Sequence, residues 1–112
     1  MREIVIAKEF TKTPGGRFRR GGPGSGEAFR DILCAALKKD DKVLVVLDGT
    51  EGYGSSFLEE AFGGMVRNGL VSADDALDKI EIVARTSPFK SYADEALVYL
   101  KEAVERAKRI GH

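Results

Sequence analysis

Apolar and polar positions follow two different spacings along the chain, and their alternation predicts strands separated by helices. A spacing of two or a short unbroken aliphatic run indicates a strand, whereas apolar residues three and four apart indicate a helix. The strand patterns cover residues 2–9, 42–48 and 79–84. The helix patterns cover residues 25–39, 56–67 and 89–109, and a short further helix is expected to open at Ser72.

The run KVLVVLD at residues 42–48 is aliphatic almost throughout, which is typical of a central strand covered on both faces. Strands that alternate with helices imply right-handed crossovers and a mainly parallel sheet. We therefore expect a single α/β domain over residues 1–112. In such a sheet the loops that follow the strands meet at one edge, where ligands usually bind. Those loops are residues 10–25, 49–55 and 85–89.

The composition supports one hydrophobic core and no membrane contact. The chain has 112 residues, of which 43% are hydrophobic, so it can fill a single core but not two. No apolar run approaches the roughly 18–20 residues that a membrane span needs. The N-terminus lacks the apolar stretch of a signal peptide, so we expect a cytoplasmic protein.

The side chains on which most enzymes depend are scarce. The single cysteine, Cys34, excludes a disulfide framework and a cysteine-based zinc site and fits a reducing compartment. The single histidine, His112, is the last residue, which leaves no internal imidazole for a nucleophilic triad or a metal site. Basic and acidic residues balance at 18 each, which disfavours general binding to nucleic acid. We expect no enzymatic activity, no metal and no cofactor.

The glycine-rich stretch GGRFRRGGPGSGEAFR at residues 15–30 has only part of a phosphate-binding motif. Gly21 and Gly26 have the first spacing of a Walker A motif, but Glu27 and Ala28 stand where lysine and a hydroxyl residue are required. Two interpretations stay open: an anion site made by free backbone N–H groups and nearby arginines, or a solvated surface loop in which Ser25 only caps the helix. The candidate anion-binding residues are Arg17, Arg19, Arg20, Ser25, Gly26 and Glu27.

Two adjacent serines open a helix pattern in the segment LDGTEGYGSSFLEEAF at residues 47–62. Ser56 and Glu59 have the spacing of a capping box, in which the hydroxyl accepts from the backbone and the carboxylate reaches back. Ser55 lies one residue before that cap and is not needed for it. A phosphate on Ser55 would be stabilised by the helix dipole and opposed by neighbouring glutamates, which is the balance that a switch requires. Alternatively, Ser55 is small only because the turn is tight.

Two glycines, Gly63 and Gly64, interrupt this helix pattern at a cost of roughly 1 kcal/mol each. They indicate that the backbone approaches a neighbour closely. The sequence leaves open whether that neighbour is the sheet or a partner.

With these motifs in hand, the chain resembles the STAS-like domains, the fold of anti-sigma factor antagonists and sulfate-transporter tails. Within that fold it is similar to a small bacterial family of unknown function. The matching segments are Gly16-Arg17, Ser25–Arg30, Val45–Gly49 and Gly54–Gly63. The resemblance implies a small sandwich with a mainly parallel sheet.

The resemblance also implies a role for the serine pair. In the anti-sigma factor antagonists the equivalent segment reads Asp-Ser-Ser-Gly, and a partner anti-sigma kinase phosphorylates its first serine. Alignment of the serine pairs places that role on Ser55. Gly54 then stands at the aspartate position and Phe57 at the glycine position.

The leading hypothesis is a non-enzymatic regulatory module that binds a protein partner and is switched by phosphorylation of Ser55 or Ser56. The resemblance implies that the partner is an anti-sigma or histidine-kinase-like ATPase. The alternatives are an anion- or nucleotide-binding module that uses the glycine-rich loop and an assembly partner without a switch. An enzyme ranks last, with Asp48, Glu51 and Arg85 around a substrate, and a homo-oligomer stays open. The candidate partner-contacting residues outside the glycine-rich loop are Asp48, Gly54, Phe57 and Glu59.

Overall fold

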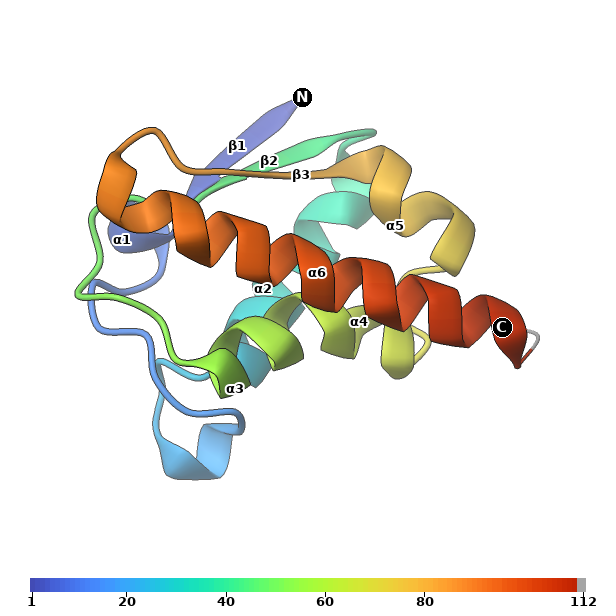
Figure 1. Cartoon of the computed structure of the whole chain (residues 1–112), viewed down its shortest axis with the longest axis horizontal. Helices are drawn as coiled ribbons and strands as arrows, with labels where there is room; N and C mark the ends of the chain where they lie inside the picture. Colours follow the sequence, from blue (N-terminus) through green and yellow to red (C-terminus); the bar gives the residue numbers. More distant parts are fainter. Residues whose placement is uncertain (111–112) are drawn as a thin grey trace.

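The structure, a computed structural model that describes residues 1–110, contains a parallel sheet of three strands with the long helices packed on one face (Figure 1). His112 lies outside the described residues. The strands are β1 (Arg2–Val5), β2 (Val43–Val46) and β3 (Ile80–Val83), in the order β1-β2-β3. Leu44 of the central strand is in register with Glu3 on one side and Glu81 on the other. The expected parallel α/β fold is confirmed.

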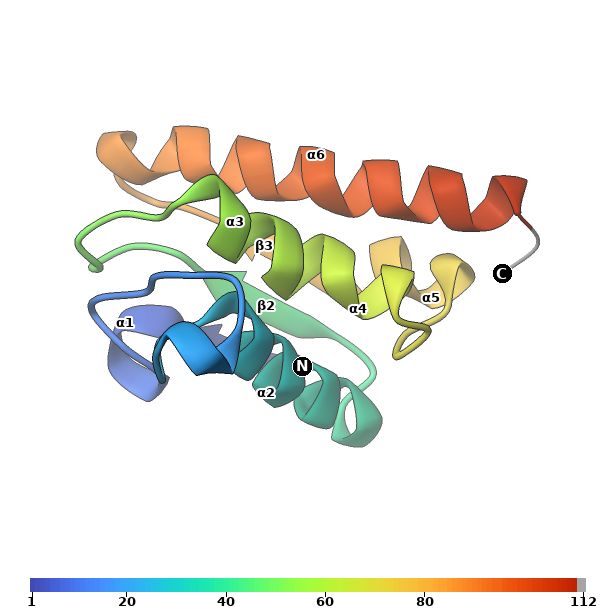
Figure 2. The same cartoon turned by 90° about the horizontal axis from the view of Figure 1, so that it is seen from below.

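Helical crossovers connect the strands. α2 (Gly26–Lys39) leads from β1 to β2. From β2 to β3 the chain passes through α3 (Ser55–Leu58), the π turn η2 (Glu59–Gly63), α4 (Gly64–Arg67) and α5 (Ala73–Lys79). α6 (Ser87–Arg109) follows β3 and runs beside α3 and α4 (Figure 1, Figure 2). Because α3, η2 and α4 follow one another without a break, we name them together the 55–67 helix.

The long helices bury aromatic side chains against the sheet. Phe29 of α2 and Phe57 and Phe62 of the 55–67 helix are fully buried. The Phe29 ring centroid lies 6.3 Å from that of Phe57 and 6.2 Å from that of Phe62. Ile4 and Val45 of the sheet belong to the same buried cluster. Burial of one such ring stabilises the fold by about 2–3 kcal/mol, so these contacts fix how the two helices lie over the sheet.

In the described part of the chain, helices cover only one face of the sheet, which differs from the expected cover on both faces. Right-handed crossovers place their helices on the same face when each new strand is added on the same side, and the order β1-β2-β3 adds them in this way. On the other face Val5 and Leu44 stay half-buried, and Arg85 pairs with Glu3 at 3.1 Å across the central strand. Because the strand order never reverses, the sheet offers no switch point for a ligand crevice.

The first strand ends at Val5, earlier than the pattern of residues 2–9 indicates. Ile6–Glu9 form the short helix α1 instead. The Glu9 carboxylate accepts a hydrogen bond from the Val5 backbone N–H at 2.9 Å, much as the acidic residue of a capping box does. The alternation of apolar residues does not reveal this turn. The other strands and helices that the sequence predicts begin and end within one or two residues of the expected positions.

Candidate functional site

The exposed serine pair opens the 55–67 helix, but the capping box predicted for Ser56 is wrong. Gly54 is the N-cap residue, and no side chain caps this end of the helix. Ser55 and Ser56 lie inside the first turn, and both are exposed. The Glu59 carboxylate does not reach back to that turn because guanidinium groups hold it, one of them from Arg17. That competing partner comes from a loop far away in the sequence, so a local spacing rule cannot detect it.

Ser55 lies against α6 at Tyr99. The Tyr99 hydroxyl donates to Glu95 Oε2 at 2.8 Å. The Ser55 hydroxyl lowers the pKa of Tyr99 and the Glu95 carboxylate raises it, so that the pKa is raised overall. A group added to the Ser55 hydroxyl would therefore change the contact between the 55–67 helix and α6.

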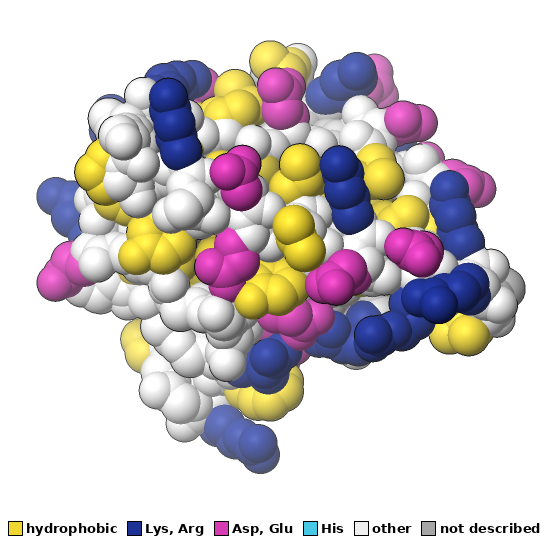
Figure 3. Space-filling model, viewed as in Figure 1, with side chains coloured by type: hydrophobic (Ala, Val, Ile, Leu, Met, Phe, Trp, Pro, Cys, Tyr) yellow, Lys and Arg dark blue, Asp and Glu magenta, His cyan; other side chains and the backbone are white. Residues whose placement is uncertain are grey.

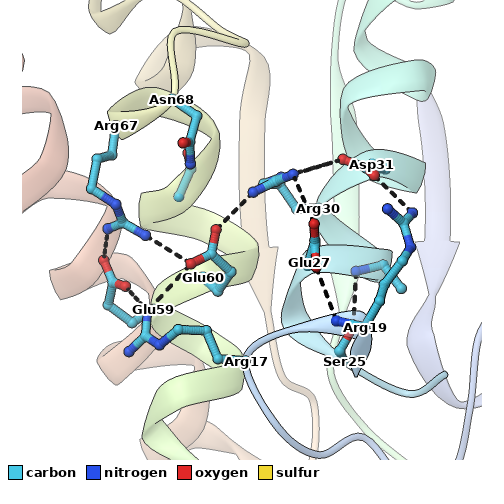
Figure 4. Close-up of polar contacts among 12 residues, drawn as sticks. Arg17, Arg19, Ser25, Glu27, Arg30, Asp31, Glu59, Glu60, Arg67 and Asn68 are labelled. Carbon is cyan, nitrogen blue, oxygen red and sulfur yellow. Dashed lines mark hydrogen bonds and ion pairs between the residues drawn. The ribbon is translucent and has the colours of Figure 1, made fainter. Parts of the chain in front are cut away.

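Two adjacent carboxylates, Glu59 and Glu60, collect guanidinium groups from three parts of the chain (Figure 4). Glu60 is only 2% exposed, and its carboxylate lies 2.8 Å from Arg30, 2.9 Å from Arg67 and 3.4 Å from Arg17. Glu59 is paired with Arg17 and Arg67. A carboxylate is tolerated in a protein interior only when it is paired. We name these five residues the arginine–glutamate cluster.

The electrostatics of Glu59 follow from these contacts. Burial alone would raise the pKa of Glu59, but hydrogen bonds from Arg67 and Arg17 outweigh it, and the pKa is lowered. In return, the hydrogen bond to Glu59 raises the pKa of Arg17 despite partial burial. Both groups therefore stay charged at neutral pH.

The π turn and two glycines make room for the carboxylates. η2 widens the helix at Glu59–Gly63, and such turns are frequent at functional sites. A Cβ on Gly63 would lie 2.8 Å from Glu59 Oε2 and 3.3 Å from the Tyr99 backbone oxygen, and one on Gly64 would collide with the Glu60 carboxylate. The close approach that these glycines indicate is thus to α6 and to the cluster.

Two hollows flank the bridge that Arg17, Glu59 and Arg67 form. A groove of about 400 Å³ between the 55–67 helix and α6 includes Tyr99 in its lining. A second hollow of about 490 Å³ lies between the helix and the glycine-rich loop and reaches Asn68. Both hollows are lined by Arg17 and Arg67. On the face that α6 presents, Lys and Arg side chains gather toward the C-terminal end of the helix (Figure 3).

The backbone N–H groups at the start of α2 already donate hydrogen bonds within the chain. Those of Gly26 and Glu27 donate to the carbonyls of Gly16 and Arg17, each at 2.9 Å. The next N–H group donates to the Ser25 hydroxyl at 3.1 Å, so Ser25 caps α2. An anion site at this helix start would need the same N–H groups, and the structure supports the capping interpretation of Ser25.

The arginines of the glycine-rich loop point to separate partners. Arg17 joins the arginine–glutamate cluster. Arg19, at the start of the short helix η1 (Arg19–Gly21), pairs with Asp31 at 2.7 Å, and its N–H donates to Glu27 at 2.9 Å. The Arg20 guanidinium lies 5.3 Å from the centroid of the Phe18 ring. The loop therefore does not aim these three arginines at one ligand.

Asp48, in the loop that follows β2, holds the start of α6. Its carboxylate accepts from the Arg85 N–H at 2.9 Å, from the Thr86 N–H at 2.8 Å and from the Thr86 hydroxyl at 2.5 Å. Desolvation opposes ionisation, but these hydrogen bonds outweigh it and lower the pKa of Asp48. The Arg85 side chain instead pairs with Glu3. The Glu51 backbone N–H donates to the Lys12 carbonyl, which lies in the loop after β1. The three loops meet as expected, but these contacts are structural.

Other predicted residues support the site from inside. Phe57 is fully buried and its ring lies 5.6 Å from that of Tyr53. Gly26 lies where α2 crosses the 55–67 helix, and a Cβ there would be 2.6 Å from the Phe57 backbone oxygen. Gly54 ends the preceding loop in an extended conformation.

Sequence reasoning missed Arg30, Glu60, Arg67 and Tyr99. A signal existed for Glu60, because it stands in an apolar helix stripe between Phe57 and Ala61, where a buried charge needs a partner. The partners themselves come from α2 and α4 and carry no motif.

Within residues 1–110, no group of His, Cys, Asp and Glu side chains could hold a metal ion. None of the helices that the structure describes is long and apolar enough to cross a membrane.

A parallel sheet with helices on one face, and a strand–loop–helix that presents a serine pair, are compatible with a small STAS-like α/β domain. Residues 25–88 match the family described as a STAS-like domain of unknown function (DUF4325). The match covers more than half of the chain, and the chain belongs to this family. Neither the curated proteins nor the solved structures contain a match.

Proposed function

We propose that the chain is a regulatory module that binds a protein partner without catalysing a reaction, and that phosphorylation of Ser55 switches this binding. The observation that carries the proposal is the exposed serine pair, in which Ser55 and Ser56 occupy the first helical turn without a capping role. Both serines are exposed, so a kinase can reach them. The similarity to anti-sigma factor antagonists suggests an anti-sigma or histidine-kinase-like ATPase as the partner.

The position of Ser55 supports a switch because it lies at the junction of two helices. It neighbours Tyr99 of α6, which lines the groove of about 400 Å³ between that helix and the 55–67 helix. A phosphate adds a charge of roughly −1.5 to −2 beside Glu95 and Glu59. A partner that contacts this surface would meet a different charge in the modified protein.

The alternative, an anion- or nucleotide-binding module built on the glycine-rich loop, has less support. The N–H groups at the start of α2 already donate within the chain. Arg17 and Arg19 are paired with carboxylates. A ligand at this loop would have to break those contacts.

The test is affinity purification of the tagged chain from its native organism, as the parent and as the Ser55→Ala and Ser55→Asp variants. We expect the parent to recover an ATPase, with phosphate on part of the Ser55–Ser56 peptide in mass spectrometry. The two variants should recover that partner in opposite amounts, because only one of them carries a charge. Ser91→Asp is the matched control, since Ser91 is an exposed serine on α6. Equal recovery by both Ser55 variants, with an unmodified peptide, would remove the switch.

A further inference from the structure

Arg17 is the side chain that ties the glycine-rich loop to the 55–67 helix. It contacts Glu59 and Glu60 and lies on the wall shared by the two hollows. In Figure 4, Arg17 meets Glu59 from the side of α3, and Arg67 meets it from the C-terminal side of the helix. Arg17 therefore links the loop to the same carboxylate that Arg67 contacts.

Ser55 lies one helical turn before Glu59, the carboxylate that Arg17 contacts. Ser55 and Glu59 are four residues apart, and side chains at that spacing are neighbours on a helix, with Cβ atoms about 5–6 Å apart. Arg17, Glu59 and Tyr99 line the same groove, and Ser55 adjoins Tyr99. We infer that Arg17 is the receptor for a phosphate on Ser55, and that the phosphoserine takes this arginine from Glu59. The inference rests on the proposed function, since it concerns what the phosphate does within the chain.

The chemistry favours the exchange. A phosphate monoester presents three acceptor oxygens and about twice the charge of a carboxylate, and guanidinium groups bind it in a bidentate manner. Arg17 uses Nη1 for both of its present contacts, so Nε and Nη2 remain as donors. The Arg17 and Glu59 side chains are 33% and 25% exposed, and both can rotate without leaving a buried charge unpaired. Glu60 keeps Arg30 and Arg67.

The exchange would change the charged side chains that line the groove. Glu59 would retain Arg67 and lose Arg17, so the charged wall of the groove would be rebuilt. The loop backbone would stay on α2, because it is held by the carbonyls of Gly16 and Arg17. Phosphorylation would therefore change the charges that a partner meets without unfolding the loop.

The experiment places phosphoserine at position 55 of the full chain and follows it by ³¹P NMR during a pH titration. An exposed phosphoserine has a second pKa near 6. We expect a lower value here, which returns toward 6 in Arg17→Gln and stays low in Arg20→Gln, the matched loss of a loop arginine. Equal phosphate titrations in the parent and in Arg17→Gln would overturn the inference.

A second measurement needs no arginine variant and holds if Arg17→Gln fails to fold. The Glu59 carboxyl is titrated by ¹³C NMR with and without the phosphate. We expect its lowered pKa to rise on phosphorylation, because Glu59 then has one guanidinium partner instead of two. An unchanged Glu59 titration would overturn the inference. If the phosphate ignores Arg17 but still changes partner binding, the inference alone fails; if it binds Arg17 and partner binding is unchanged, the proposed function alone fails.

Discussion

At the scale of the residue, Glu60 shows how one buried carboxylate can bring separate segments together. It is 2% exposed and contacts three arginines. In Glu60→Gln these guanidinium groups lose their shared counter-charge, and removal of one partner from a buried ion pair typically costs 3–5 kcal/mol. Because two of the arginines are partly exposed, we expect a loss of about 3 kcal/mol in the free energy of unfolding, measured with urea.

The matched control for this prediction is Glu51→Gln, which removes an exposed carboxylate from the loop after β2. Surface substitutions of this kind usually change stability by less than about 0.5 kcal/mol. A midpoint for Glu60→Gln equal to that of the control would show that the cluster contributes no net stability.

At the scale of the element, the crossing of α2 and the 55–67 helix depends on Gly26. A Cβ at this position would lie 2.6 Å from the Phe57 backbone oxygen and 3.0 Å from Glu60 Cβ. In Gly26→Ala the two helices must separate, and we expect a loss of about 2 kcal/mol, typical of an overpacked contact. Gly21→Ala is the control, because a Cβ at Gly21 meets no atom within 4 Å. Thermal unfolding measures both, and equal melting temperatures would contradict the close contact.

The elements that local pattern determines could be predicted, and those that depend on distant partners could not. α2 and α6 follow from apolar spacing, and the aliphatic run of β2 indicated its central place in the sheet. The Ser56–Glu59 capping box failed because Arg17, from another segment, holds Glu59. α1 was missed because it depends on one hydrogen bond, from the Val5 backbone N–H to the Glu9 carboxylate, which the spacing of apolar residues does not indicate.

At the scale of the whole molecule, the sequence predicted a parallel sheet and the serine pair of the candidate site. It did not predict that helices would cover one face of the sheet, since this follows from strand order, which only the tertiary structure provides. The arginine–glutamate cluster escaped for the same reason. Its members lie on the glycine-rich loop, α2, η2 and α4, and ion pairs between such segments leave no spacing in the sequence.

Stability against acid is a property of the whole molecule, because two carboxylates join segments that are distant in the chain. Asp48 ties β2 to the start of α6, and Glu59 ties the glycine-rich loop to the 55–67 helix. Their pKa values are lowered in the folded state from ordinary values of 3.8 and 4.5. A carboxylate with a lowered folded pKa stabilises the protein above its unfolded pKa, and this contribution is lost as the pH falls through the folded value.

We therefore expect the free energy of unfolding to be nearly constant near neutral pH and to fall as the pH drops below about 4.5. Asp48→Asn should remove about 2 kcal/mol at pH 7, where the charged acceptor is lost. The effect should be smaller at pH 3, because this pH lies below the ordinary value of 3.8, where the stabilising contribution of the ionised form is being lost. The two urea curves should thus converge in acid. Asp41→Asn, at an exposed position, should have the same free energy of unfolding as the parent at both pH values. If the difference in free energy of unfolding between Asp48→Asn and the parent were the same at both pH values, the hydrogen bonds at the start of α6 would not stabilise the ionised form. The link between the sheet and α6 would then rest on packing alone.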